Sequence, residues 1–382
     1  MPLLEKGFRP FFLLGAAFAV VAVPLWLFAL KGGLEPGGAF GAMNWHAHEM
    51  LFGFTTAIIA GFLLTAVSNW TGRETITGWP LGALAVLWTL GRAAVLCASR
   101  LPKLVPALLD VAFLPALAIA CALPLAATHN RRNYGFVALL FGLAAANVSA
   151  HWFALHGDLE AVRLAHRFAL NLIVVMLVTM TGRVVPMFTR NATRLSWVRP
   201  VPVLERCSLA AVVLLAVLDL VPDAGLLSAL LATAAAGLLL ARMWFWGTQH
   251  TASTPMLWIL HVGALFLPLG LLLQSVARGV PALPAGSALH ALTAGAVGSL
   301  TLGMMARVSL GHTGRALELE PSMKWAFLCV IVGALARIGA PMLPATRYLA
   351  VLSLAAALWS GAFAVFLLAY WRILVSARSD AG

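Results

Sequence analysis

The histidines are the residues of this sequence that are best able to bind a metal. Ten of them occur in 382 residues, and most lie inside or beside long apolar segments. Imidazole is a common protein ligand of haem iron and copper, and its neutral form is tolerated in a dry helical bundle where a carboxylate is not. Helical bundles build such sites from side chains on facing helices. The histidines therefore predict a metal or haem site whose ligands are positioned by apolar helices.

The composition requires that lipid surrounds most of the chain. Hydrophobic residues make up 62% of the sequence and charged residues only 10%, whereas about a quarter of a soluble domain is usually charged. A span needs roughly 20 apolar residues, and the chain divides into about twelve such segments. They lie near residues 9–30, 45–68, 79–97, 104–127, 134–156, 163–186, 204–221, 224–247, 256–277, 287–311, 323–340 and 346–374. We predict an all-α polytopic integral membrane protein, with residues 1–382 forming a single transmembrane helical domain.

Membrane topology explains the excess of basic residues. Lys and Arg number 25 against 13 Asp and Glu, but they sit singly or in pairs at the ends of apolar segments, as topology determinants do. They form no basic face, which excludes nucleic acid as a partner. More of them lie at the ends that are cytoplasmic if the N-terminus is inside, so we predict that both termini are cytoplasmic. Arg92 and Asp110 lie at similar depths on the third and fourth spans, where we expect a structural ion pair.

Placed on this topology, the histidines gather toward the outer membrane face. His46 and His48 open the second span, and His151 lies about one turn from the outer end of the fifth. His166 and His290 lie in the first outer turns of the sixth and tenth spans. For any one of them the alternative is a hydrogen-bonded histidine near the interface. For the whole set chance is the weaker explanation, because five residues from four spans share one depth to within roughly two helical turns.

The densest polar cluster at a span end is the segment 44–50. On an α-helix His46 and His48 are about 200° apart, so only one of them can address a given site. Glu49 is three residues after His46 and is expected on its face, as a further metal ligand. The alternative is an interfacial cap with Trp45 as an aromatic anchor. The spacing differs from the HExxH of zinc proteases, so nothing here supports a hydrolase.

A second polar group lies toward the inner ends of the spans. Arg183 and Arg307 are inside spans, and His261 and His312 lie on the same inner side. The two arginines either snorkel to the interface or pair with haem propionates, which suit the bidentate guanidinium. All four residues are therefore candidates for cofactor binding.

Several stretches resemble the NnrS family, bacterial membrane proteins described as containing haem and copper and linked to nitric oxide stress. They are Gly7-Phe-Arg-Pro-Phe-Phe12, Trp45-His-Ala-His-Glu-Met-Leu-Phe-Gly53, Ala60-Gly-Phe-Leu-Leu-Thr65, Gly182-Arg-Val-Val-Pro-Met-Phe-Thr-Arg190, His290-Ala-Leu-Thr-Ala-Gly295 and Arg307-Val-Ser-Leu-Gly-His-Thr-Gly-Arg315. The resemblance implies twelve spans in the bacterial inner membrane, b-type haem and copper as cofactors, and a role in relieving nitrosative stress. Carried onto this chain, the family's histidine motifs fall at His46, His48, His290 and His312, with His151, His166 and His261 as further candidates.

These observations favour a membrane protein that binds haem and copper and acts on, or responds to, nitric oxide. Its partners would be lipid, nitric oxide or a related small molecule, and an electron donor. We expect His290 to be an axial haem ligand with His46 or His48 opposite, and His151 and His166 to contribute a further site. The alternatives are a transporter, which would carry charged midplane residues, and a maturation factor that holds haem transiently.

The inner position of Arg307 generates a first prediction. Ligands near the outer face and arginines near the inner face are separated by much of a hydrocarbon core of about 30 Å. We therefore expect Arg307→Ala to lower the expression level and to leave the amount of haem per purified protein unchanged. Loss of half the haem from well-folded Arg307→Ala protein would instead indicate an inner haem.

Overall fold

The chain folds into helices joined by short connections. The computed structural model describes residues 1–221, 224–280 and 282–379, and these residues contain no strand, so the all-α prediction is confirmed. Of the range predicted as one domain, residues 222–223, 281 and 380–382 lie outside the described residues. The chain divides into two compact units: the first holds residues 1–170, 308–317 and 367–382, and the second holds residues 171–307 and 318–366.

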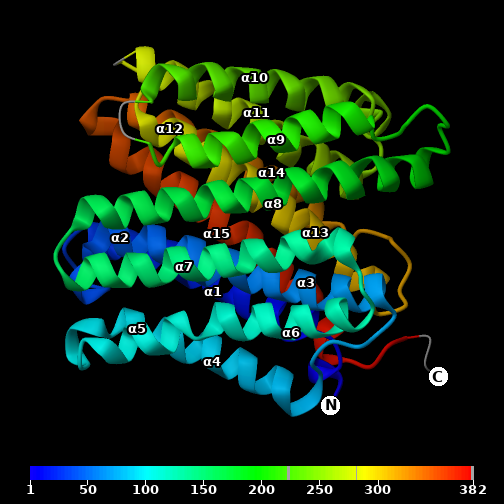
Figure 1. Cartoon of the computed structure of the whole chain (residues 1–382), viewed down its shortest axis with the longest axis horizontal. Helices are drawn as coiled ribbons and strands as arrows, with labels where there is room; N and C mark the ends of the chain where they lie inside the picture. Colours follow the sequence, from blue (N-terminus) through cyan, green and yellow to red (C-terminus); the bar gives the residue numbers. More distant parts are fainter. Residues whose placement is uncertain (222–223, 281, 380–382) are drawn as a thin grey trace. The chain divides into compact units, whose positions relative to one another are not determined.

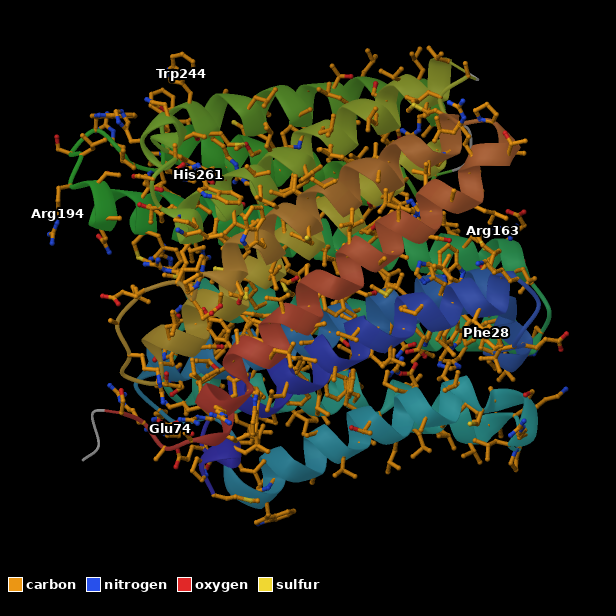
Figure 2. The ribbon with its side chains drawn as sticks, turned by 180° about the vertical axis from the view of Figure 1, so that it is seen from behind. Phe28, Glu74, Arg163, Arg194, Trp244 and His261 are labelled. Atoms are coloured by element: carbon orange, nitrogen blue, oxygen red, sulfur yellow. The ribbon has the colours of Figure 1, made fainter. Side chains whose placement is uncertain are left out.

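The first unit contains the N-terminal helices (Figure 1). They are α1 (Phe8–Leu30), α2 (Gly41–His48), α3 (Thr56–Thr71), α4 (Gly78–Leu96), α5 (Leu104–Val111), α6 (Phe113–Ala127), α7 (Tyr134–Leu155) and the start of α8 (Leu159–Thr193). Helix α1 packs on α3, α4 packs on α5, and α6 packs on both α3 and α7. Phe28 and Arg163 lie at one end of these helices and Glu74 at the other (Figure 2). Lys6 pairs with Glu74 at 2.9 Å, so the first residues of the chain lie at the Glu74 end.

The second unit contains α9 (Pro202–Leu218), α10 (Gly225–Trp244), α11 (Pro255–Gly279), α12 (Ala285–His290) and α14 (Ser322–Gly339). Three helices, α8, α13 (Gly298–Gly311) and α15 (Ala345–Val375), have residues in both units. Helix α10 packs on α9 and α11, and α12 packs on α11 and α14. Large apolar side chains such as Trp244, which is 80% exposed, point away from the helices (Figure 2). Such residues are expected where lipid covers the surface, because water would make large apolar patches unfavourable.

Eleven helical segments among the described residues are long and apolar enough to cross a membrane. This confirms a multi-pass membrane protein and agrees with the predicted bundle of about twelve spans. The remaining segment, α9, has 17 residues, which is at the lower limit for a span. The second span extends over Gly38–Thr71, and the fourth, Leu104–Ala127, joins α5 to α6.

Two spans are interrupted by π-helical turns that the apolar pattern does not predict. The π-helix η3 (Glu49–Thr55) begins directly after His48, and the π-helix η7 (Ala291–Val297) begins directly after His290. Both have seven residues. π-Turns are rare and occur frequently at functional sites. Their position therefore singles out these two histidines from the rest of the set.

Close packing of α1 on α3 depends on Gly61, which generates a second prediction. A Cβ atom at Gly61 would lie 2.8 Å from the ring of Phe12, which is fully buried. We expect Gly61→Val to destabilise the protein by about 1–3 kcal/mol, because a well-packed core does not accept extra methyl groups without strain. Thermal unfolding in detergent measures the effect. The matched control is Gly135→Val on α7, where an added Cβ has no neighbour within 4 Å; equal stability of the two variants would contradict the prediction.

Candidate metal centre

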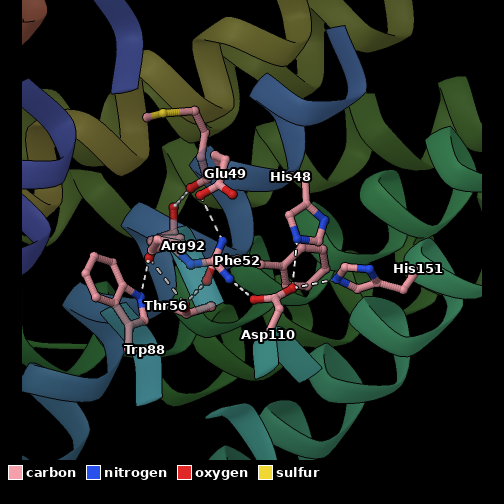
Figure 3. A network of polar contacts seen from close by, with 11 residues as sticks. His48, Glu49, Phe52, Thr56, Trp88, Arg92, Asp110 and His151 are labelled. Carbon is pink, nitrogen blue, oxygen red and sulfur yellow. Dashed lines mark hydrogen bonds and ion pairs between the residues drawn. The ribbon is translucent and has the colours of Figure 1, made fainter. Parts of the chain in front are cut away.

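A buried carboxylate joins two of the predicted histidines in the first unit. Asp110 lies on α5, and its Oδ2 atom is 2.8 Å from Nε2 of His48 on α2 and 2.8 Å from Nε2 of His151 on α7 (Figure 3). The three side chains are buried, and their ligand atoms all lie within 4.8 Å of one another. Three different spans therefore converge on one set of nitrogen and oxygen donors. Their spacing can hold a metal ion.

An ion-pair network lies behind this carboxylate. Arg92 on α4 pairs with Asp110, and its Nη1 donates to Glu49 Oε2 at 2.8 Å (Figure 3). The predicted Arg92–Asp110 pair is thus confirmed, and Glu49 extends it. Two carboxylates face one guanidinium, so the cluster retains one negative charge when both carboxylates are ionised and its imidazoles are neutral. Taking charges out of water is costly unless they are paired and hydrogen-bonded, and an added cation would compensate the remaining charge.

The π-helix explains why Glu49 is found here. The sequence predicted Glu49 on the face of His46, but Glu49 bonds Arg92 in the His48 cluster, while His46 stacks on Trp26 with ring centroids 4.1 Å apart. A π-helix has i→i+5 hydrogen bonds and rotates less per residue than an α-helix. Because η3 begins at Glu49, the adjacent side chains of His48 and Glu49 can both face the cluster. The expected divergence of His46 from His48 agrees with the stacking on Trp26.

His166 completes the group of imidazoles. It lies on α8, is 5% exposed, and its ring centroid is 5.6 Å from that of His48. Neither of its ring nitrogens has a hydrogen-bond partner among the described residues. Buried polar groups are normally paired. His166 is therefore available to donate a hydrogen bond or to bind a metal. The rings of Phe40 and Phe52 lie 4.6 and 5.0 Å from that of His48 and form an apolar wall.

The hydrogen bonds define which imidazole nitrogens are available. An ionised carboxylate only accepts hydrogen bonds, so His48 and His151 each donate Nε2–H to Asp110. The lone pair of a neutral His48 is then on Nδ1, which is buried without a partner in the described chain. A metal ion could bind Asp110 and both Nε2 atoms directly, with each imidazole proton moved to its Nδ1 atom. Alternatively it could bind Nδ1 of His48, with Asp110 orienting the ring from behind, as carboxylates commonly do for metal-ligating histidines.

The two other predicted histidines of the spans lie in the second unit. His261, labelled in Figure 2, is buried, with Nε2 2.9 Å from the Thr189 hydroxyl and Nδ1 2.9 Å from the Thr248 hydroxyl. Both of its ring nitrogens are therefore used. His290 has Nδ1 2.6 Å from the Gly286 carbonyl oxygen one turn earlier. A carbonyl accepts, so Nδ1 carries the proton and Nε2 the lone pair.

The residues predicted at the inner ends of the spans do not form one cluster within the first unit, because Arg183, His261 and Arg307 belong to the second unit. Arg307 places its guanidinium over the ring of Phe188, 3.9 Å from the centroid, which is a cation–π contact within the second unit. Arg183 also belongs to the second unit and is partly buried on α8. The contact of Arg307 does not require a haem propionate.

His312 lies just beyond the tenth span, in the first unit. Its ring centroid is 5.9 Å from that of Phe8. Burial, followed by the nearby charges of Lys6 and Arg378, lowers the pKa of His312 from its ordinary value. The ring is therefore neutral at pH 7 and can act as a ligand or as a core residue.

Asp110 and Arg92 are the site residues that the sequence interpretation did not include among the ligands. Both were interpreted as structural, although an ionisable residue inside a span is a functional candidate by default. This general rule was the feature of the sequence that could have identified Asp110 and Arg92 as site residues. It could not show that Asp110 would meet His48 and His151, because these residues come from three spans far apart in the sequence.

The helical fold and this buried cluster define a multi-pass membrane protein with an intramembrane imidazole–carboxylate site. The family model described as NnrS protein matches residues 2–378, so the chain belongs to the NnrS family. The resemblance in the sequence is thereby confirmed. None of the curated proteins matches the chain.

The ion-pair network generates a third prediction. Replacing Arg92 by Met leaves two buried carboxylates without a cation, and we expect a loss of about 3–5 kcal/mol in the free energy of unfolding. Thermal unfolding in detergent measures it. The triple variant Arg92→Met with Asp110→Asn and Glu49→Gln removes all three charges and should recover most of that stability. An Arg92→Met protein as stable as the wild type would show that the network is solvated or unpaired.

Proposed function

We propose that this chain is an inner-membrane protein of the bacterial nitric oxide response that binds copper at His48, Asp110 and His151 and also binds haem. The observation that carries the proposal is the convergence of these three donors on one buried point. Membership of the NnrS family supports the link to nitric oxide. The protein would use lipid as its solvent and would need an electron donor for any redox turnover.

The charge of the cluster favours a bound cation. Two carboxylates and one guanidinium leave one negative charge among residues that are almost fully buried. Monovalent or divalent copper would offset this charge at the place where the imidazoles converge. Imidazole suits copper, iron, zinc and nickel, and two histidines with one carboxylate also form the usual site of non-haem iron. The resemblance to the family favours copper. If the test below finds iron instead, the site stands and the ion is iron.

The residues of the chain fit such an ion without rearrangement of the helices. The 2.8 Å separations between Asp110 Oδ2 and the two Nε2 atoms need to open by only a few tenths of an ångström to surround an ion with ligand bonds of about 2.0–2.2 Å. His166, with two unpaired nitrogens, would supply a further ligand or bind the incoming molecule. Bound copper or haem iron would supply nitric oxide binding and one-electron chemistry.

The surrounding residues would hold the ligands and keep water out. Arg92 would fix the carboxylate of Asp110 so that its second oxygen faces the two imidazoles. Phe40, Phe52 and the lipid would exclude water, since the rings of both phenylalanines contact that of His48. A small uncharged diatomic molecule can cross this apolar surrounding, whereas ions cannot.

We further propose that both termini are cytoplasmic. The cations favour that side. In the first unit Arg9 donates to the carbonyl oxygens of Leu374 and Ser376, so the two ends of the chain lie together. This contact supports a common side for both termini, and the excess of cations at the span ends on that side favours the cytoplasm.

The metal content of three histidine variants tests the proposal and is our fourth prediction. We expect His48→Ala and His151→Ala to lower copper per purified protein at least tenfold, because each removes one of three donors. His156→Ala is the matched control, since His156 follows α7, which carries His151, and bonds only its own helix at the Trp152 carbonyl. Elemental analysis gives the metal, and size-exclusion chromatography in detergent checks folding.

Growth of cells under a nitric oxide donor supplies the second measurement. The control should restore growth to a deletion strain, and the two site variants should not. Folded His48→Ala and His151→Ala proteins with the copper content of the wild type would remove this cluster as the metal site. Iron in place of copper would retain the site and change the ion.

A further inference from the structure

The first and ninth spans pack on their following spans through glycines at matching positions. A Cβ at Gly15 on α1 would lie 2.5 Å from Ile58, and a Cβ at Gly263 on α11 would lie 2.9 Å from Leu300. Gly263 follows Gly15 by 248 positions and Leu300 follows Ile58 by 242. A glycine on one helix thus meets an apolar side chain of the next span at the same place in both units.

The reciprocal contacts follow the same offsets. A Cβ at Gly53 on the second span would lie 2.9 Å from Phe18, and a Cβ at Gly295 on the tenth would lie 2.5 Å from Phe266. A Cβ at Gly61 would meet the ring of Phe12 and the Cβ of Phe11, and a Cβ at Gly303 would meet Ile259 and Leu260; the nearest distance is 2.8 Å in both cases. Again the glycines are 242 positions apart, and Phe266 and Ile259 follow Phe18 and Phe11 by 248. Two helical hairpins are therefore built on one pattern.

The second and tenth spans share further landmarks at the same spacing. Each begins with a histidine, His48 or His290, that is followed at once by a seven-residue π-helix. Each is followed by Thr-Gly-Arg, over 71–73 and 313–315, at equal distances from its histidine. Both of these glycines are left-handed, with φ of 66° and 71°. That conformation suits glycine after a helix end.

The match continues into the next two spans. A Cβ at Gly91 on α4 would lie 3.1 Å from the backbone of Asp110 on α5, and a Cβ at Gly333 on α14 would lie 3.1 Å from the backbone of α15 at Ala355. Gly333 again follows Gly91 by 242 positions. Small residues at such crossings let membrane helices approach closely. Spans one to four and spans nine to twelve are thus two copies of one four-span module.

The repeat gives His290 the position in the second module that His48 has in the first, but with different neighbours. Ala291 and Ala334 stand where the first module has Glu49 and Arg92. Among the described residues, the only group of three metal-ligating side chains is the one in the first unit. His290 therefore belongs to no such group among the described residues, and a single imidazole cannot chelate a bare metal ion.

The two histidines also present different nitrogens. His48 uses Nε2 for Asp110 and leaves Nδ1 buried without a partner in the described chain. His290 uses Nδ1 for the Gly286 carbonyl and leaves Nε2 for a ligand. A backbone carbonyl on Nδ1 fixes the tautomer and orientation of the ring, and this arrangement is common for histidines that bind a metal through Nε2.

A half-buried arginine lies on the helix that packs against the His290 segment. The Ser287 hydroxyl donates to the Ile338 carbonyl at 2.8 Å, which joins α12 to the end of α14 one residue from Arg337. The Nη1 atom of Arg337 is buried, with no hydrogen-bond partner among the residues that the structure describes. A guanidinium with such a donor is suited to a carboxylate.

We propose that the two modules hold different centres, with His290 Nε2 the axial ligand of haem and Arg337 the partner of a haem carboxylate. Haem brings four nitrogen donors of its own, so one imidazole suffices to attach it. Its propionates meet the free donor of Arg337. The inference rests on the proposed function and assigns its two cofactors to separate four-span modules.

Separate measurement of the two cofactors in single variants tests this assignment and is our fifth prediction. We expect His290→Ala to lower haem per protein at least tenfold and to leave copper unchanged, and His48→Ala to do the reverse. Haem is read from the Soret and pyridine haemochrome spectra and copper from elemental analysis. His250→Ala, in a connecting segment outside both modules, is the matched control.

Two further variants keep the test decisive if His290→Ala does not fold. His290→Met should retain haem with a shifted absorption and electron paramagnetic resonance spectrum, because sulfur replaces nitrogen at the iron. Arg337→Gln should release haem at least tenfold faster to apomyoglobin. An unchanged spectrum in His290→Met and unchanged haem in His290→Ala would overturn the inference. Wild-type protein that carries neither haem nor copper would instead overturn the proposed function.

Discussion

The pairing of Asp110 with Arg92 is the constraint on which the candidate centre depends. A carboxylate inside a membrane helix has no water to solvate it, so it must be paired and hydrogen-bonded or remain uncharged. Arg92 takes one oxygen of Asp110 and leaves the other to His48 and His151. Four spans are thereby joined at one point, because α2, α4, α5 and α7 each supply a partner that the others need. Removal of any partner leaves a buried polar group unsatisfied.

The same network sets the chemistry that the cluster can support. Glu49 adds a second carboxylate to the single guanidinium, and the resulting negative charge is matched by a cation better than by another hydrogen-bond donor. His166 stands beside this cluster, and neither of its ring nitrogens has a hydrogen-bond partner in the described part of the chain. Phenylalanine rings cover the imidazoles, so the local dielectric is low and each electrostatic interaction is strengthened. Structural pairing and the proposed metal binding therefore use the same charges.

The repeated module shows how one helical framework can carry two different sites. Glycine contacts and the π-helix position a histidine in the same way at His48 and His290. The surrounding residues differ: the first copy has Glu49 and Arg92 where the second has Ala291 and Ala334, and among the described residues only the first histidine contacts a carboxylate of a charged cluster, that of Asp110. The hydrogen bond to the ring then decides which nitrogen remains available. Backbone packing is thus common to both copies, while a few polar substitutions separate their chemistry.

The sequence by itself determined the membrane class and the approximate spans, because apolar length and cation placement act locally along the chain. The common depth of the histidines remains a prediction. The sequence also predicted the Arg92–Asp110 pair from depth alone. Only the tertiary structure decided that Asp110 meets His48 and His151, that Glu49 joins them through a π-turn, and that His261 is occupied by two threonine hydroxyls. These outcomes depend on the rotation of each helix about its axis. That rotation is set by packing against neighbouring helices, where a π-turn or a glycine changes which side chains face one another.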